Sequence, residues 1–393
     1  MASALSTEQR EILATVREFV DKEVIPVASE YEHADEYPTP FVDQMKEMGL
    51  FGVTIPEEYG GLGLDLTTYA LIQVELSRGW MSLSGVLNTH FISAWMIKTY
   101  GTDEQREKYL ARMATGELHS AYSMTEPHAG SDVQAIRTLA ERDGDEFVIT
   151  GQKMWATNGF QSSMIMLLAK TDPGAEPRHR GMTAFVLEKE PAVSEQAGLV
   201  IPPKLKKLGY KGVESVELVF DGFRTPAASV LGGEAGIGEG FKYFMGGIEL
   251  GRVNIAARAI GIATAAFEAS IRYAQEREAF GKPIAQHQSI QIKLAQMATK
   301  IEASRLLMLQ ASEKKDLGER ADLEAGMAKY FATEAAQENA LDSMRIHGGY
   351  GYSLEFNVER LYRDAPLLLI GEGSNEIQQL IIARRLLEKH KVA

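Results

Sequence analysis

A carboxylate between two glycines is the residue in this sequence best placed to act as a general base. Glu372 lies in the segment IGEGSNEI, residues 370–377, directly before a predicted helix. The glycines leave the backbone uncrowded, so the side chain could project into a cavity, where burial would raise its pKa toward that of a useful base. The competing interpretation is a solvated loop glutamate, which is the usual fate of this residue type.

Three further segments carry residue types suited to binding a flat or phosphorylated ligand. In YSMTEPHAGSD, residues 122–132, hydroxyls and a glycine allow close approach to a polar ligand, although a turn-rich entry to a sheet would look similar. In KMWATNG, residues 153–159, a Trp could cover an aromatic ligand, or simply fill a core before an Asn-Gly turn. In RIHGGYGY, residues 345–352, glycines beside an Arg suit a pyrophosphate, or mark a helix break.

Other common chemistries have little support in the sequence. No Gly-x-Gly-x-x-Gly motif follows a predicted strand, and no phosphate-binding loop of the Walker type occurs. The 8 histidines show no metal-ligand spacing, so we expect no metal site, and the absence of cysteine excludes disulfides and thiolate chemistry. With 41 Lys and Arg against 54 Asp and Glu, the net charge of −13 argues against a nucleic-acid partner.

The sequence predicts a cytoplasmic protein with no membrane partner, of the soluble bacterial type. The first residues, MASALSTEQREIL, contain no apolar core of a secretory signal. No apolar run approaches the length that is needed to cross a bilayer.

The predicted elements follow the order helix, sheet, helix. Ser6 and Gln9 are spaced as a capping box before an apolar stripe, which predicts an N-terminal helix. Residues 216–221 alternate apolar and polar side chains like a strand, and no helical pattern separates them from the strands before. Helical spacing returns later, for example at 290–301.

We therefore expect an α+β protein of three domains. An N-terminal helical domain spans residues 1–117, a middle antiparallel β domain spans 118–231, and a C-terminal helical domain spans 232–393. Long helices joined by short loops predict a four-helix bundle for the last domain.

Taken together and in this order, the segments resemble the signatures of the acyl-CoA dehydrogenase family, over essentially the whole chain. Residues 122–132 resemble its first flavin-binding signature and 153–159 its second. REAFGKPIAQHQ, residues 277–288, resembles the segment that reaches the cofactor of a neighbouring subunit. Residues 345–352, followed by EGSNEIQ at 372–378, resemble the C-terminal signature.

The resemblance implies an FAD site that two subunits share. Trp155 would flank the isoalloxazine ring, and Thr157 would bond near its N5 atom. From a second subunit, Arg277, Phe280 and Gln288 would hold the adenine-diphosphate end. The complete set of implied cofactor-binding residues is Tyr122, Met124, Thr125, Gly130, Ser131, Trp155, Thr157, Arg277, Phe280, Gln288, Arg345, His347, Gly348, Gly349, Ser374 and Glu376.

The same resemblance implies an acyl-CoA substrate, in a channel lined by Ser131, Glu249, Arg252 and Gly373. Glu372 would remove the α-proton while a hydride leaves the β-carbon for flavin N5, which gives a trans-2-enoyl-CoA. Electrons would pass to electron-transferring flavoprotein, and the family is usually a homotetramer, a dimer of dimers. Chain length and branching of the acyl group are not predicted.

Comparison with family members supports Glu372 as the base. Some relatives, including those for isovaleryl-CoA, carry the base at the position matching Gly251, which cannot act here. Gly371 replaces a Tyr of several relatives and opens space beside the acyl chain. Relatives that take glutaryl-CoA carry an Arg in the segment matching 80–82, where this chain has none, which disfavours that substrate.

Two alternatives stay open beside the dehydrogenase. An acyl-CoA oxidase-like flavoprotein would be re-oxidised by O₂, but oxidases commonly carry an extra C-terminal domain and this chain ends soon after Arg384. A redox-silent relative would act only as a binding partner, although Glu372, Trp155 and Thr157 argue against it.

Overall fold

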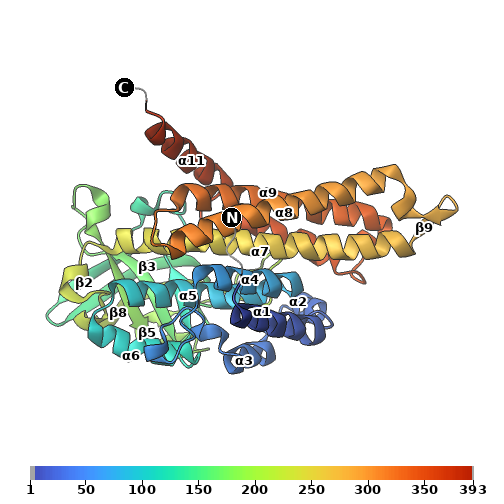
Figure 1. Cartoon of the computed structure of the whole chain (residues 1–393). Coiled ribbons are helices and arrows are strands. Elements are labelled where there is room, and N and C mark those ends of the chain that lie inside the picture. Colours follow the sequence, from blue (N-terminus) through green and yellow to red (C-terminus); the bar gives the residue numbers. More distant parts are fainter. Residues whose placement is uncertain (1–4, 392–393) are drawn as a thin grey trace.

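The computed structural model describes residues 5–391 and shows the predicted order of helices, sheet and helices (Figure 1). The N-terminal part is helical, and its first helix begins at the predicted capping box, in which Ser6 and Gln9 bond each other's backbone N–H groups. Its helices are α1 (Thr7–Phe19), α2 (Ala28–Ala34), α3 (Thr39–Glu47), α4 (Leu66–Gly79), α5 (Met81–Tyr100) and α6 (Asp103–Ala114).

The middle part is one sheet in the strand order β1-β4-β2-β3-β8-β7-β6, with β5 beside β4. Most pairs are antiparallel, as predicted, whereas β4 runs parallel to β1 and at one position to β2. Its strands are β1 (Ser120–Ser123), β2 (Leu139–Asp143), β3 (Glu146–Thr157), β4 (Met164–Lys170), β5 (Met182–Glu188), β6 (Glu195–Gln196), β7 (Leu199–Val200) and β8 (Ser215–Pro226).

The C-terminal part consists of long helices that extend away from the sheet. In Figure 1 a small hairpin, β9 and β10, caps the end of these helices that lies opposite the sheet. The elements are α7 (Gly240–Glu276), β9 (Glu278–Ala279), β10 (Lys282–Pro283), α8 (Gln288–Asp316), α9 (Asp322–His347), α10 (Val358–Ile370) and α11 (Asn375–Lys389).

Helix α7 connects the parts, because one of its faces packs against α4 and α5 of the N-terminal part. A Cβ added at Gly261 would lie 2.5 Å from the carbonyl oxygen of Val74, so the small residue permits this close approach. The residues of this face recur at helical spacing and are small or polar: Gly247, Gly251, Asn254, Arg258 and Gly261.

Helix α11 leaves part of its apolar stripe uncovered. The predicted stripe at 377–381 is present, but Leu380 is 63% exposed and Leu387 is 75% exposed. Figure 1 shows the helix projecting from the bundle. Exposed apolar faces of this kind are typical of surfaces that pack against another chain.

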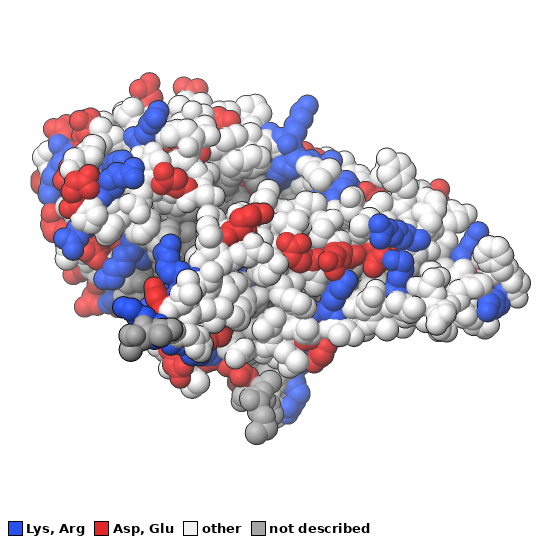
Figure 2. Space-filling model, turned by 90° about the horizontal axis from the view of Figure 1, so that it is seen from above, with Lys and Arg blue, Asp and Glu red and all other residues white. Residues whose placement is uncertain are grey.

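The surface carries charges of both signs. Figure 2 shows Lys and Arg interspersed with Asp and Glu over the viewed face, while the end of the long helices is mostly uncharged. Within residues 5–391, no helix is long and apolar enough to span a membrane.

Candidate active site

The predicted base lies in the short loop between α10 and α11. Glu372 has a left-handed backbone with φ 55°, which directs its side chain toward α5 and α7. Its Oε1 accepts a hydrogen bond of 2.9 Å from Nδ2 of Asn88 on α5. A Cβ added at Gly251 on α7 would lie 2.7 Å from Cδ of Glu372, so the carboxylate occupies space that any other residue at 251 would fill.

The surroundings tune this carboxylate toward proton transfer. Burial raises the pKa of Glu372 above its ordinary value, while the bond from Asn88 and the charges of Arg258, Arg252 and Lys329 oppose the rise. A raised pKa brings a glutamate nearer to the working pH, where a general base is most effective. The residue as a whole stays partly accessible to solvent.

A buried lysine holds the two ends of the Glu372 loop together. Lys329 on α9 donates to the carbonyl oxygen of Leu369, at 3.0 Å, and to Oδ1 of Asn375, at 2.6 Å. These acceptors lie at the end of α10 and the start of α11. Gln378 adds a bond of 3.2 Å from Nε2 to the carbonyl oxygen of Gly373. The loop is therefore fixed from both sides, as a positioned base requires.

The first predicted flavin-binding segment reaches the same region. The Tyr122 hydroxyl donates to the carbonyl oxygen of Phe244 on α7, at 3.1 Å. The pKa of Tyr122 is raised well above its usual value, first by burial and then by the negative charge of Glu372. Residues 250 positions apart in the sequence thus lie in one electrostatic environment.

A buried ion pair joins the two predicted flavin-binding segments to each other. Lys153 Nζ lies 2.9 Å from Oε1 of Glu126 and also donates to the carbonyl oxygen of Met124, at 3.0 Å. The backbone N–H of Met154 donates to the carbonyl oxygen of Thr125, at 2.8 Å. These bonds align the two segments side by side.

A bulge in β3 presents the predicted ring-flanking residue. The register with β8 shifts between Lys153 and Ala156. Trp155 within the bulge has φ 63° and remains 53% exposed, which is unusual for so large an apolar side chain. Thr157 returns to the ladder opposite Ser215. The strand thereby offers an aromatic face and, two residues later, a hydroxyl.

The other cofactor-binding residues predicted in these segments and in the Glu372 loop are more exposed to solvent. Gly130 and Ser131 are exposed, and a Cβ at Gly130 would meet no atom within 4 Å. Ser374 is the N-cap of α11, and Glu376 is exposed in its first turn. Open backbone of this kind can approach a ligand closely.

The predicted channel residues on α7 belong to a polar cluster. Glu249 Oε1 lies 3.2 Å from Nζ of Lys315 and accepts from the N–H of Ala321, at 3.3 Å. Burial lowers the pKa of the neighbouring Arg252, although Glu249, Asp322 and Glu372 oppose this effect. The pKa of Arg252 is therefore affected by both the polar cluster and the base.

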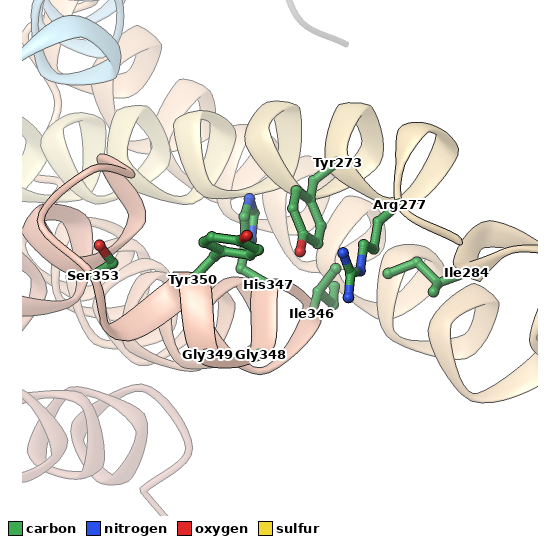
Figure 3. Close-up of a pocket in the computed structure, with 9 residues that line it drawn as sticks. All are labelled: Tyr273, Arg277, Ile284, Ile346, His347, Gly348, Gly349, Tyr350 and Ser353. Atoms are coloured by element: carbon green, nitrogen blue, oxygen red, sulfur yellow. The ribbon is translucent and has the colours of Figure 1, made fainter. Parts of the chain in front are cut away.

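A second group of predicted residues lies around a pocket of about 560 Å³ at the end of the long helices. Figure 3 shows Tyr273 and Arg277 on α7 pointing toward the segment that begins at His347. The Tyr273 and His347 rings stack with centroids 4.3 Å apart. Gly348 and Gly349 line the same pocket, so it combines an aromatic face, a guanidinium and open backbone.

The other predicted residues of this group, Phe280, Gln288 and Arg345, do not line the pocket. Phe280, at the turn between β9 and β10, has φ 54° and is 96% exposed. Gln288 is the first residue of α8. Arg345 lies 3.5 Å from the Asp342 carboxylate and does not line the pocket. The position of β9 in Figure 1 places this group at the end of the helices opposite the sheet that carries Trp155, so one chain does not bring the two groups together.

Both groups fit parts of a flavin dinucleotide. The bulged Trp155 and the paired segments beside it offer a flat face with hydroxyl and amide edges, as an isoalloxazine ring requires. The Arg277 pocket offers stacking and a charge for an adenine-diphosphate end. No cluster of three or more potential metal-ligating side chains occurs in the described part of the chain.

Several residues of the site were not predicted from the sequence. Asn88 lies within a largely apolar helical stretch, and Lys329 and Arg258 lie within runs rich in alanine. Isolated polar residues on otherwise buried helix faces are the signal that could have indicated them.

The fold and the comparisons together define an enzyme of the acyl-CoA dehydrogenase class. Family models match in chain order: "Acyl-CoA dehydrogenase, N-terminal domain" over residues 6–117, the middle domain over 121–223 and the C-terminal domain over 238–387. The chain belongs to the acyl-CoA dehydrogenase family.

Individual relatives agree on the class and differ in substrate. An acyl-CoA dehydrogenase of Bacillus subtilis is 40% identical over 98% of this chain and 99% of its own. The structure of butyryl-CoA dehydrogenase from Megasphaera elsdenii matches with a TM-score of 0.92 and 34% identity, over 98% of this chain and 100% of that one. A glutaryl-CoA dehydrogenase from Mycobacterium smegmatis in complex with FADH2 matches with a TM-score of 0.89 and 28% identity, over 99% and 97%.

Proposed function

We propose that this chain is an FAD-dependent dehydrogenase that converts an acyl-CoA thioester into a trans-2-enoyl-CoA, with Glu372 as the base. The observation that carries the proposal is the position of the Glu372 carboxylate, which fills the space above Gly251, is held by Asn88 and is tuned by burial. FAD, when bound, supplies the acceptor for the hydride that leaves the β-carbon.

The residues of the chain account for the proton-transfer part of the reaction. Glu372 takes the α-proton, and its raised pKa makes it a stronger base than a solvated glutamate. Arg252, Arg258 and Lys329 favour its ionised form before the transfer. Lys329 and Gln378 keep the loop in place while the proton moves.

The division of the cofactor-binding residues supports an oligomer. The Trp155 group and the Arg277 pocket lie at opposite ends of one chain, so a second copy would complete each FAD site. The exposed Phe280 and the uncovered apolar residues of α11 are surfaces such a copy could cover. We propose a homotetramer, built as a dimer of dimers, with electron-transferring flavoprotein as the electron acceptor.

Anaerobic flavin bleaching tests this function. The purified protein should be yellow, and an acyl-CoA thioester added without oxygen should bleach the flavin. Glu372→Gln should retain FAD and bind the thioester without bleaching. A colourless protein that refuses FAD contradicts the proposal, and rapid re-oxidation of the reduced flavin by air would favour the oxidase alternative.

A further inference from the structure

Arg258 on α7 is a buried cation without an ionic partner. The residue is 3% exposed, and within residues 5–391 no carboxylate lies within 4.0 Å of it. Its Nε and Nη2 atoms are buried and have no hydrogen-bond partner. Two other buried cations, Lys153 and Arg78, pair with carboxylates at 2.9 and 2.6 Å. An unpaired buried charge is costly, so its retention calls for an explanation.

The side chain of Arg258 is directed toward the base. Arg258 and Gly251 lie on the same face of α7, seven residues or about 10 Å apart along the helix. Cα–Cβ bonds in a helix tilt toward its N-terminus, so the long Arg258 side chain runs back toward Gly251, above which Glu372 lies. Among the charges that oppose the raised pKa of Glu372, that of Arg258 acts most strongly.

Tyr210 holds the guanidinium by its face. The guanidinium carbon lies 4.8 Å from the centre of the Tyr210 ring. Tyr210 is itself fixed, because its backbone has φ 57° and its N–H donates to Oδ1 of Asp364, at 2.7 Å. A Cβ at Gly85 on α5 would lie 2.6 Å from Cε2 of Tyr210, so the ring sits against α5. Burial raises the pKa of Tyr210, and the charge of Arg258 and its hydrogen bond to the Tyr210 side chain oppose the rise. The Nε and Nη2 atoms of Arg258 have no partner and stay free to donate.

We propose that Arg258, supported by Tyr210, binds the terminal carboxylate of a short acyl-CoA, so that the enzyme prefers dicarboxylic acyl thioesters. A guanidinium edge with two free N–H groups matches a carboxylate geometrically and supplies its countercharge. The rise of about 10 Å between Gly251 and Arg258 is shared with the Arg258 side chain, so the proposal is limited to short acyl chains of about four or five carbons. This inference rests on the proposed function, because it takes Glu372 as the site of the thioester.

The positive charge that could bind a terminal carboxylate lies at a different position from the one predicted by the family resemblance. The lack of an Arg at 80–82 disfavoured a glutaryl-CoA substrate. Arg258 supplies a positive charge from α7 instead. A terminal carboxylate is therefore compatible with this chain.

Matched pairs of thioesters test the preference. Succinyl-CoA and butyryl-CoA have equal chain lengths and differ in the terminal group, as do glutaryl-CoA and pentanoyl-CoA. Anaerobic bleaching of the wild-type holoenzyme should favour the carboxylate-ended partner in at least one pair by about 10- to 100-fold in kcat/KM. A preference for the methyl-ended partner in both pairs, or equal rates, overturns the proposal even if Arg258 variants fail to fold.

Substitution of Arg258 separates recognition from structure. Arg258→Met should slow both partners to some extent, because the charge of Arg258 also favours the ionised form of Glu372. It should slow the dicarboxylic thioester further and so remove the preference, which Arg258→Lys should restore in part. Tyr210→Phe keeps the ring under the guanidinium, so it should keep the preference. A loss in Arg258→Met that is equal for both partners would mean that Arg258 acts only on the structure or on the pKa of Glu372, and this result overturns the proposal.

Binding without turnover distinguishes this inference from the proposed reaction. In Glu372→Gln, succinyl-CoA and butyryl-CoA binding can be followed by the perturbation of the flavin spectrum. Tighter binding of succinyl-CoA, abolished by adding Arg258→Met, supports the carboxylate site even if no thioester bleaches the wild-type flavin. Equal binding of the two thioesters contradicts the carboxylate site while leaving the dehydrogenase reaction standing.

Discussion

Gly251 and Glu372 share one space: a Cβ on Gly251 would lie 2.7 Å from Cδ of Glu372 and would overlap its carboxylate. The glycine on α7 is therefore a requirement for the glutamate of the α10–α11 loop. Residue 251 has no side chain here, and the Glu372 carboxylate enters this space from the loop between α10 and α11.

Gly251→Ala should displace Glu372 and lower kcat by about 100-fold, because small misplacements of a base have effects of this size. FAD binding should persist, since the three atoms nearest to a Cβ at residue 251 all belong to Glu372 and not to a predicted cofactor-binding residue. Steady-state kinetics with FAD content measured in parallel checks this. Gly174→Ala, at a site where a Cβ would meet its nearest atom at 3.5 Å, is the control. Unchanged kcat in Gly251→Ala would show that the carboxylate does not need this space.

Glu372→Gln should lower the rate of flavin reduction by at least about 10³-fold and make the protein more stable near neutral pH. Burial raises the folded-state pKa of Glu372 above its unfolded value. Between those two values the folded state binds the extra proton, so stability falls as the pH rises through this window and stays lower above it. Glu372→Gln removes the carboxylate charge and therefore removes this loss of stability at higher pH.

Thermal unfolding at pH 5 and pH 8 measures the effect of Glu372→Gln on stability. The gain in Tm for Glu372→Gln should be larger at pH 8 than at pH 5. In the wild type, kcat/KM should rise with pH through the raised pKa of Glu372, because only the ionised form accepts the proton. A Glu372→Gln protein with wild-type turnover would refute the assignment of the base.

Lys329→Met should lower kcat by about 10- to 100-fold by releasing the ends of the Glu372 loop. The substitution should also raise the pKa seen in the pH–rate profile, because the positive charge of Lys329 lowers the pKa of Glu372. Burial lowers the pKa of Lys329 itself to about 8, so in the wild type this support should weaken above that pH. Lys300→Met, which removes only a partly exposed pair with Glu338, is the control.

The order of the elements could be predicted from the sequence because it depends on local patterns, whereas the assignment of Glu372 as the base stays a prediction. The Ser6–Gln9 capping box and the alternation in β8 involve only neighbours in the chain. The contacts of Glu372 with α5, α7 and α9 could not be predicted in this way, because Asn88 and Lys329 come from segments far away in the sequence.

The arrangement of the apolar and aromatic residues was predictable only in part. The pattern at 377–381 predicted a helix with an apolar stripe, but not that Leu380 stays exposed in one chain. The position of Trp155 depends on a bulge in β3, which periodicity does not reveal. The domain boundaries at 117 and 231 stay predictions.

Mixed oligomers test whether two chains share each FAD site. Trp155→Ala and Arg277→Ala should each lower FAD affinity strongly, because each removes one of the two separated groups. When the two inactive variants are unfolded and refolded together, heterodimers should contain one intact site and one doubly altered site. Activity should recover to roughly a quarter of the wild-type value, as random pairing predicts. If each FAD site were built within one chain, mixing would restore nothing, whereas each variant refolded alone should stay inactive in either case.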